Sequence, residues 1–251
     1  MTQFTVFLLA THWTPTLDNS LATLRKHNFP FTLLAKGETW KGWKWRTQQY
    51  LRAAENACDN EILIFLDAFD TLCQKDSCDF ITNFQAFNAD IVLGCEWYCG
   101  NSSNCGNVDA WWSHHSFTST PMRKYVNAGC VIGRARALRK MYRSMLMNDI
   151  DDDQLALAEW VNNNPDSCAL DYGSAMVYNA HILDLQKTPV MPYFLHYPGP
   201  LFKHKMFPRY NKDLKDILGT RGKFIHCSEW ITLLFYLAML MLSLLLLYKL
   251  V

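Results

Sequence analysis

The sequence lacks a strong excess of charge of either sign. Its 24 lysines and arginines nearly balance its 23 acids, and the formal net charge is +1. Because no basic field is present, a nucleic-acid partner has no electrostatic support, and we expect none. The sequence also contains no internal repeat, and no low-complexity segment apart from its apolar C-terminal tail. Nothing in it therefore indicates a repeat architecture.

No group of cysteines has the spacing of a zinc-finger site, although the chain contains nine. Their number is odd and their spacing is irregular. Free thiols in a reducing compartment are one interpretation. A disulfide within the loop that holds Cys95, Cys99 and Cys105 is the alternative.

The N-terminus lacks the basic region and the small-residue cleavage site of a signal peptide, so Phe4–Ala10 is predicted to be a buried first strand. At the other end, Trp230–Tyr248 carries no charge and could span roughly 28 Å as a helix. We expect it to be a single-pass transmembrane helix that attaches the protein to a membrane. Basic residues before it outnumber Lys249 after it, which predicts that the preceding domain is cytoplasmic.

Short apolar runs alternate with helical patterns along the rest of the chain. The predicted strands are Phe4–Ala10, Phe31–Ala35, Glu61–Asp67, Asp90–Cys95, Gly129–Gly133 and Val190–His196. The predicted helices are Thr16–His27, Lys44–Ala57, Phe80–Phe87, a segment after Gly133 and Asp151–Asn163. This alternation predicts an α/β fold with a mostly parallel central sheet. Residues 197–227 are rich in proline, glycine and lysine and are predicted to be loops.

Two carboxylates, Asp67 and Asp70, follow the apolar strand at Ile62–Leu66. Ligands of open α/β sheets bind outside the carboxyl ends of the strands, so paired acids there favour Mg²⁺ or Mn²⁺. A solvated turn with a capping aspartate is the alternative. Haloacid-dehalogenase-type phosphatases also place aspartates after an apolar strand. Their aspartates are two positions apart, whereas Asp67 and Asp70 are three apart, which argues against that chemistry.

Three other places carry polar residues that could complete a site. Residues 151–153 are consecutive aspartates at the start of a predicted helix, which is more acid than dipole matching requires. Gly129 would permit the close approach of a ligand to the backbone. His196 ends the last predicted strand before a turn of glycine and prolines, and is a candidate third metal ligand. A histidine in such a position can equally be structural.

These segments together resemble the glycosyltransferase domain of the procollagen lysyl hydroxylases and, through it, the collagen glycosyltransferases. The matching segments follow the order of the family across residues 4–205: Gly37–Gly42, Lys44, Phe65–Asp70, Glu96, Cys99, Asn127–Gly129, Ile132–Gly133, Asp151–Gln154, His196 and Gly199–Pro200. Agreement of several segments in order is more specific than any one of them.

The resemblance implies a GT-A fold, an α/β nucleotide-sugar-binding domain that binds a UDP-sugar through Mn²⁺ or Mg²⁺. It implies that Asp67, Asp70 and His196 are the metal ligands. Lys44 would contact the diphosphate. Phe69, which stands where the family has a tyrosine, would stack on the uracil.

The resemblance also implies that Asp152 and Asp153 lie near the sugar and the acceptor. Further residues that it assigns to the donor site or to the loop above it are Asn127, Gly129, Gly199, Trp97 and Tyr98. The chain departs from the family at Tyr197 and Pro198, where the family has glycine and asparagine. The resemblance therefore does not imply diphosphate contacts from that turn. No hydroxylase domain follows, so lysyl hydroxylation is not predicted.

We therefore expect a glycosyltransferase domain at residues 1–205, a connecting segment at 206–229 and a transmembrane helix at 230–248. The expected reaction transfers a hexose, glucose or galactose, from UDP to a hydroxyl group on a protein, glycan or lipid. Two other classes stay open. One is a metal-dependent phosphatase or nucleotide-sugar hydrolase, and the other is a catalytically inactive, membrane-tethered protein that binds sugar nucleotides.

Overall fold

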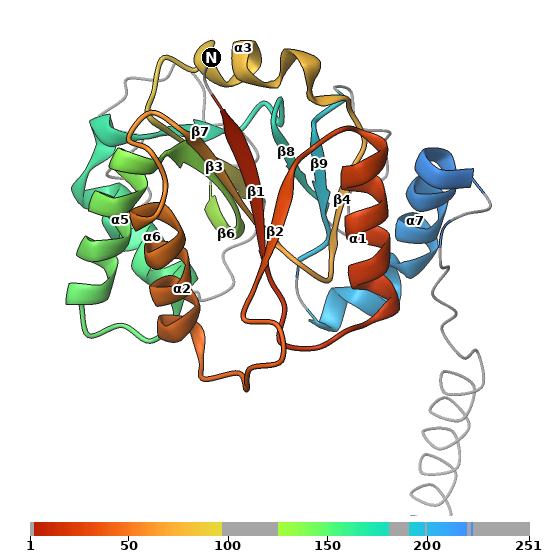
Figure 1. Cartoon of the computed structure of the whole chain (residues 1–251), viewed down its shortest axis with the longest axis horizontal. Coiled ribbons are helices and arrows are strands. Elements are labelled where there is room, and N and C mark those ends of the chain that lie inside the picture. Colours follow the sequence, from red (N-terminus) through yellow and green to blue (C-terminus); the bar gives the residue numbers. More distant parts are fainter. Residues whose placement is uncertain (1–2, 97–124, 181–190, 199, 220–221, 223–251) are drawn as a thin grey trace, which may run out of the picture.

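A six-stranded sheet forms the centre of the molecule. The structure is a computed structural model that describes residues 3–96, 125–180, 191–198, 200–219 and 222. The strand order is β2-β1-β3-β6-β5-β7 (Figure 1). The bounds of these strands are Phe4–Leu9 (β1), Phe31–Leu34 (β2), Ile62–Asp67 (β3), Ile91–Glu96 (β5), Tyr125–Arg134 (β6) and Ala169–Asp171 (β7).

The central sheet is mixed, and the predicted mostly parallel sheet is wrong. Strand β6 pairs antiparallel with both β3 and β5, while β1–β2, β1–β3 and β5–β7 are parallel pairs. Continuous apolar runs are typical of parallel strands because helices cover both faces of such sheets. Strand β6 is buried on both faces too. A strand that is buried on both faces is apolar whether it runs parallel or antiparallel to its neighbours. The sequence pattern of β6 therefore does not reveal its direction.

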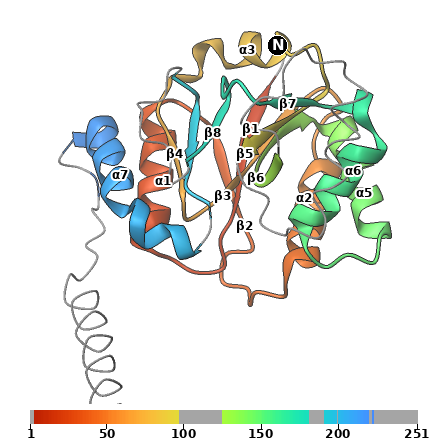
Figure 2. The same cartoon turned by 180° about the vertical axis from the view of Figure 1, so that it is seen from behind.

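Helices cover both faces of this sheet, and the alternation of side chains along β3 shows why. Leu63 and Phe65 point to one face, where they pack with the helices α2, α5 and α6. Ile64 and Leu66 point to the opposite face and pack with α1 and α3. Figures 1 and 2 show α2, α5 and α6 grouped on one side of the sheet and α1 and α7 on the other.

The helices have the bounds Pro15–Lys26 (α1), Trp43–Glu55 (α2), Phe80–Gln85 (α3), Ala135–Met147 (α5), Asp153–Asn163 (α6) and Pro200–Leu218 (α7), with short 3-10 turns at Ser77–Asp79 and Pro165–Ser167. Helix α1 illustrates how the sequence sets such limits. Thr14 caps it by accepting a hydrogen bond from the Leu17 backbone N–H at 3.1 Å, and Pro15 occupies its first position. Arg25 and Lys26 stand at its C-terminal end, where the helix dipole favours positive charge.

A second, three-stranded sheet lies beside α1 and was not predicted. Its order is β4-β9-β8, with β4 at Thr71–Cys73, β8 at Val177–Asn179 and β9 at Phe194–His196. Strand β9 pairs antiparallel with β4 and parallel with β8. Of these strands only β9 lies within a predicted strand, Val190–His196. The other two were missed because three residues are too few to show a reliable alternation of polar and apolar residues.

Helix α7 occupies part of the segment that was predicted to be loops. It contacts α1, and its Leu214 and Tyr210 pack with Leu72 and Leu195 of the small sheet. The helix runs across residue 205, where the sequence analysis places a domain boundary. The domain limits at 205 and 229 stay predictions.

The expected transmembrane helix and membrane localisation are not supported and are not carried further. Within the described ranges, no helix is long and apolar enough to cross a bilayer. Residues 230–248 lie outside the described residues. The fold assignment is corrected accordingly to an α/β fold with a mixed sheet and no assigned membrane span.

The packing of α7 predicts that it contributes to the stability of the domain. Leu214 is fully buried, so Leu214→Ala should lower the free energy of unfolding by about 2–5 kcal/mol. Lys215→Ala, an exposed change on the same helix, should alter it by no more than about 0.5 kcal/mol. Urea denaturation of the full chain measures both. Equal stabilities for the two variants would contradict the packing of α7 against the small sheet.

Candidate functional site

Three side chains from distant parts of the chain converge at the carboxyl end of β3. Asp67 is the last residue of β3, Asp70 immediately precedes β4, and His196 is the last residue of β9. One potential ligand atom from each lies within 4.8 Å of the others. Two carboxylates and an imidazole nitrogen suit a divalent cation such as Mn²⁺. These three residues could therefore hold a metal ion.

The pairing of β4 with β9 explains how His196 reaches the two aspartates. Thr71 of β4 lies opposite His196 in this antiparallel pair. The backbone N–H of Tyr197 donates to the carbonyl oxygen of Asp70 at 2.9 Å and extends the pairing by one more bond. The register of two short strands thus places His196 beside the β3–β4 turn.

The orientation of the His196 ring is set by Asn179 on β8. The amide Nδ2 of Asn179 donates to the carbonyl oxygen of Cys95 at 3.0 Å. Its Oδ1 therefore faces His196 and accepts a hydrogen bond from Nδ1 at 2.7 Å. Such an outer partner fixes the ring and leaves Nε2 as the nitrogen that could bind a metal ion.

Nε2 of His196 faces the two carboxylates. It lies 3.4 Å from Oδ2 of Asp67 and 3.8 Å from Oδ1 of Asp70. It is buried, and within the described part of the chain it makes no hydrogen bond. Burial alone would lower the pKa of His196, but the charges of Asp67 and Asp70 outweigh it, and the pKa is raised. By their geometry, the ring and the two carboxylates could share a proton or a cation.

Gly129 on β6 provides the space for this ring. A methyl group on its Cα would lie 2.7 Å from Nε2 of His196, and closer still to Cε1. No side chain fits there while the ring keeps its place. The sequence analysis predicted the close approach of a ligand at Gly129, and the structure shows that a ring of the protein itself occupies the position.

Arg46 on α2 is a site residue that the sequence analysis missed. Its buried guanidinium donates to Oδ1 of Asp67 and, at 2.5 Å, to Oδ2 of Asp153. Trp43, Arg46 and Tyr50 have helical spacing, and all three line one cavity. Lys44, between Trp43 and Trp45, does not line it. The sequence does not separate Arg46 from Lys44, because helical spacing shows which residues share a face of α2 but not which face meets the sheet.

The acids at the start of α6 have different environments. Asp152 caps the helix by accepting from the Leu155 backbone N–H at 2.9 Å. Asp153 is buried against Arg46. Burial raises the pKa of Asp153 to about 6 although Arg46 opposes this rise. Asp153 contacts Arg46 rather than the helix N-terminus, so capping accounts for only one of these two acids.

Asn127 belongs to a polar network between β5, β6 and α6. Its Oδ1 accepts from the Gly129 backbone N–H at 2.8 Å, and its Nδ2 donates to Gln154 at 3.4 Å. Gln154 in turn donates to Glu96 at 2.9 Å. The network fixes the backbone beside His196. Its members are close to the three converging residues without completing their ligand set.

A cavity of about 270 Å³ opens beside Asp67 and Asp70. Phe69 lines it and stacks on the ring of His12, with ring centroids 5.1 Å apart and planes inclined by 27°. Trp40 and Trp43 also line it and are 42% and 47% exposed. The cavity thus combines carboxylates, one arginine and several aromatic faces. Gly199, Trp97, Tyr98, Cys99 and Cys105 lie outside the described residues.

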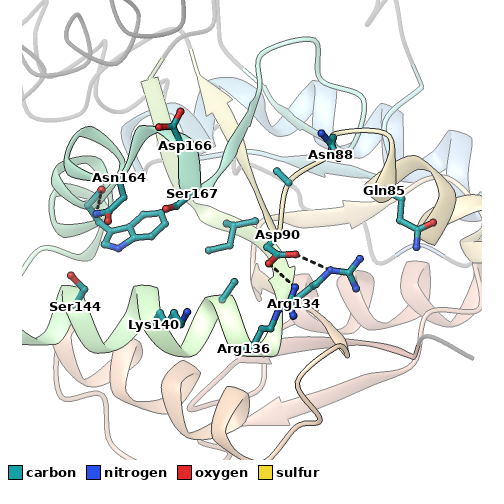
Figure 3. A pocket seen from close by; sticks show the side chains of 14 residues that line it. Gln85, Asn88, Asp90, Arg134, Arg136, Lys140, Ser144, Asn164, Asp166 and Ser167 are labelled. Atoms are coloured by element: carbon teal, nitrogen blue, oxygen red, sulfur yellow. Dashed lines mark hydrogen bonds and ion pairs between the residues drawn. The ribbon is translucent and has the colours of Figure 1, made fainter.

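A larger hollow of about 760 Å³ lies at the opposite edge of the sheet (Figure 3). Arg134, one of its lining residues, pairs with Ile62 at the start of β3, whereas Asp67 ends that strand. Asp90 accepts ion pairs from both Arg134 and Arg136 at 2.9 and 3.1 Å. Both arginines of this hollow therefore share the single carboxylate of Asp90, and the hollow is separate from the converging residues.

Comparisons with known proteins bear on the family and on the fold. The family model described as "PLOD GT domain" matches residues 1–166. The fold resembles a crystal structure of a glycosyltransferase involved in the glycosylation of the major capsid of PBCV-1, with a TM-score of 0.52 and 14% identity over 78% of this chain and 93% of that one. At this identity the likeness shows the fold alone. A search of curated proteins found no match. His196 lies beyond the matched residues, so its place in the site rests on the geometry.

The contact between Gly129 and His196 gives a prediction on stability. Gly129→Ala should lower the free energy of unfolding by about 1–3 kcal/mol, because the added methyl group must displace the ring or the strand. Gly173→Ala is the matched control, since a methyl group there has no atom within 4 Å. The control should stay within about 1 kcal/mol of the parent in urea denaturation. An undisturbed Gly129→Ala variant would show that the ring does not occupy this position.

Proposed function

The chain belongs to the PLOD GT domain family, and on that premise we propose that it is a metal-dependent glycosyltransferase. It transfers a hexose, glucose or galactose, from a UDP-sugar to a hydroxyl group on a protein, glycan or lipid. The observation that carries this proposal is the convergence of Asp67, Asp70 and His196 beside an aromatic-lined cavity.

Three residues of the site would bind the metal ion. Asp67, Asp70 and His196 would hold Mn²⁺ or Mg²⁺, with the imidazole oriented by Asn179. The buried Nε2 and the two carboxylates fit such an ion by their chemistry. When bound, the ion would supply positive charge to the diphosphate of the departing UDP.

The remaining assignments concern the donor and the acceptor. Phe69 offers a flat face to the uracil. Lys44 does not line the cavity, so we do not assign it to the diphosphate. We assign Asn127 to the donor site. The ring of His196 occupies the space at Gly129, and Gly199 lies outside the described residues. We assign Asp152 and Asp153 to the positioning of sugar or acceptor hydroxyl groups, and Asp153 contacts Arg46 at 2.5 Å.

The direct test is turnover of radiolabelled UDP-hexoses by the purified full chain in Mn²⁺, with a panel of protein, glycan and lipid acceptors. Asp70→Asn and His196→Ala should each abolish transfer, and EDTA should do the same to the parent until Mn²⁺ is restored. Each change removes a metal ligand, so the loss should exceed about a hundredfold. Asp76→Asn is the matched control, because Asp76 faces His27 in a similar pair, 3.0 Å apart, away from the site.

The products separate the possible classes of protein. Labelled acceptor supports a transferase. Release of free sugar or phosphate without labelled acceptor would instead indicate a hydrolase or phosphatase. Absence of any turnover, with UDP-sugar binding retained, would indicate an inactive binding protein. Transfer by the parent that survives EDTA and both ligand substitutions would overturn the proposed metal centre.

The aromatic face of Phe69 predicts an effect on donor binding. Stacking on a base contributes on the order of 1 kcal/mol, so Phe69→Ala should raise the KM for the UDP-sugar by about tenfold or less. Phe69→Tyr keeps the ring and should be nearly silent. Calorimetry with UDP measures the same difference. Unchanged UDP affinity in Phe69→Ala would show that the ring serves only to pack against His12.

A further inference from the structure

We propose that Arg46 is a positioning residue for the transfer reaction, one that holds the metal ligand Asp67 and the acid Asp153 in a fixed relative arrangement. This inference rests on the proposed function and deepens it. Its basis is the pattern of contacts around one buried guanidinium, which connects β3 to α6 through α2.

The guanidinium uses its planar fork on two carboxylates at once. One terminal nitrogen donates to Oδ1 of Asp67. Nε and the other terminal nitrogen both lie 2.5 Å from Oδ2 of Asp153. Charge-assisted hydrogen bonds of this kind are strong and directional, because the donors of arginine lie in one rigid plane. The relative position of the two acids therefore follows from the position of Arg46.

The two carboxylate oxygens of Asp67 have different partners. Oδ1 accepts from Arg46, while Oδ2 faces Nε2 of His196 at 3.4 Å. Rotation of the carboxylate about its last bond would break the bond to Arg46. Arg46 thus presents one defined oxygen of Asp67 to the metal site.

Aromatic rings hold the guanidinium itself in place. Its central carbon lies 4.7 Å from the ring centroid of Trp43 and 5.8 Å from that of Tyr50. Such cation–π contacts restrict the plane of an arginine. Trp43 is half-exposed and lines the cavity, so a donor in the cavity lies against the side chain that holds Arg46.

A simpler role for Arg46 would be to neutralise the buried charge of Asp153. A buried carboxylate needs a positive partner, and removal of one partner destabilises a protein. Lysine satisfies that need as a point charge but cannot bind two carboxylates in one plane. Arg46→Lys therefore separates positioning from neutralisation.

The experiment measures Mn²⁺ binding by the full chain without nucleotide, from the electron paramagnetic resonance signal of free Mn²⁺, together with turnover and thermal unfolding. If Arg46 positions Asp67, Arg46→Lys should weaken Mn²⁺ binding and lower kcat by about 10–100-fold each, the range found for residues that orient metal ligands. The KM for the UDP-sugar should change less. Parental Mn²⁺ affinity and kcat in Arg46→Lys would overturn the inference.

Arg139→Lys is the matched control. Nη1 of Arg139 on α5 donates to the carbonyl oxygens of Ala54 and Ala57 at 2.9 and 3.2 Å. Nη2 donates to Asp59, so this arginine also uses both arms of its fork, away from the site. Its substitution should leave Mn²⁺ affinity and kcat unchanged. An equal loss in both variants would mean that any disturbed arginine impairs the domain, which also overturns the inference.

A second variant covers the case in which Arg46→Lys fails to fold. Arg46→Met combined with Asp153→Asn removes a cation and an acid together and leaves the net charge unchanged. Mn²⁺ binding should stay weakened by about tenfold or more, because Oδ1 of Asp67 has lost its donor. Parental affinity in this variant would overturn the inference. A parent protein that neither binds Mn²⁺ nor turns over UDP-sugar would overturn the proposed function itself. An active parent together with an Arg46→Lys variant of parental Mn²⁺ affinity and kcat would overturn only the role of Arg46.

Discussion

The site depends on the antiparallel pairing of two three-residue strands, β4 and β9. This pairing places His196 opposite Thr71, one residue after Asp70, and the N–H of Tyr197 secures it by donating to the Asp70 carbonyl oxygen. A shift of the register by one residue would turn the His196 side chain to the other face of the small sheet. The backbone of a minor sheet thus determines whether an imidazole and two carboxylates meet at the end of a strand of the major sheet.

The burial of charge at this place follows from the alternation of side chains along β3. Asp67 shares a face with Phe65, the face that α2 and α6 cover. Arg46 and Asp153 come from those two helices, so they meet Asp67 from the same side. Buried carboxylates are costly unless positive groups compensate them. The arginine pairs with both acids, and the remaining negative charge faces His196, where a cation could be held.

The sequence predicts the larger parts of this arrangement and fails on the smaller ones. The alternation of apolar runs and helical patterns predicts an α/β fold, and paired acids after an apolar strand predict where a site lies. The direction of β6 could not be predicted, because burial on both faces hides it. Helix α7 was missed because Pro208 opposes a helix in its interior. Arg46 was missed in favour of Lys44, because the choice depends on which face of α2 meets the sheet.

The central claim is that Asp67, Asp70 and His196 form one metal centre. Anomalous diffraction from crystals of the protein grown with Mn²⁺ and UDP tests it most directly. The account predicts a single strong manganese peak in the cavity, with an oxygen of each aspartate and Nε2 of His196 at about 2.1–2.2 Å from it. A peak bound to other residues, or no peak at this place while UDP occupies the cavity, would contradict the account.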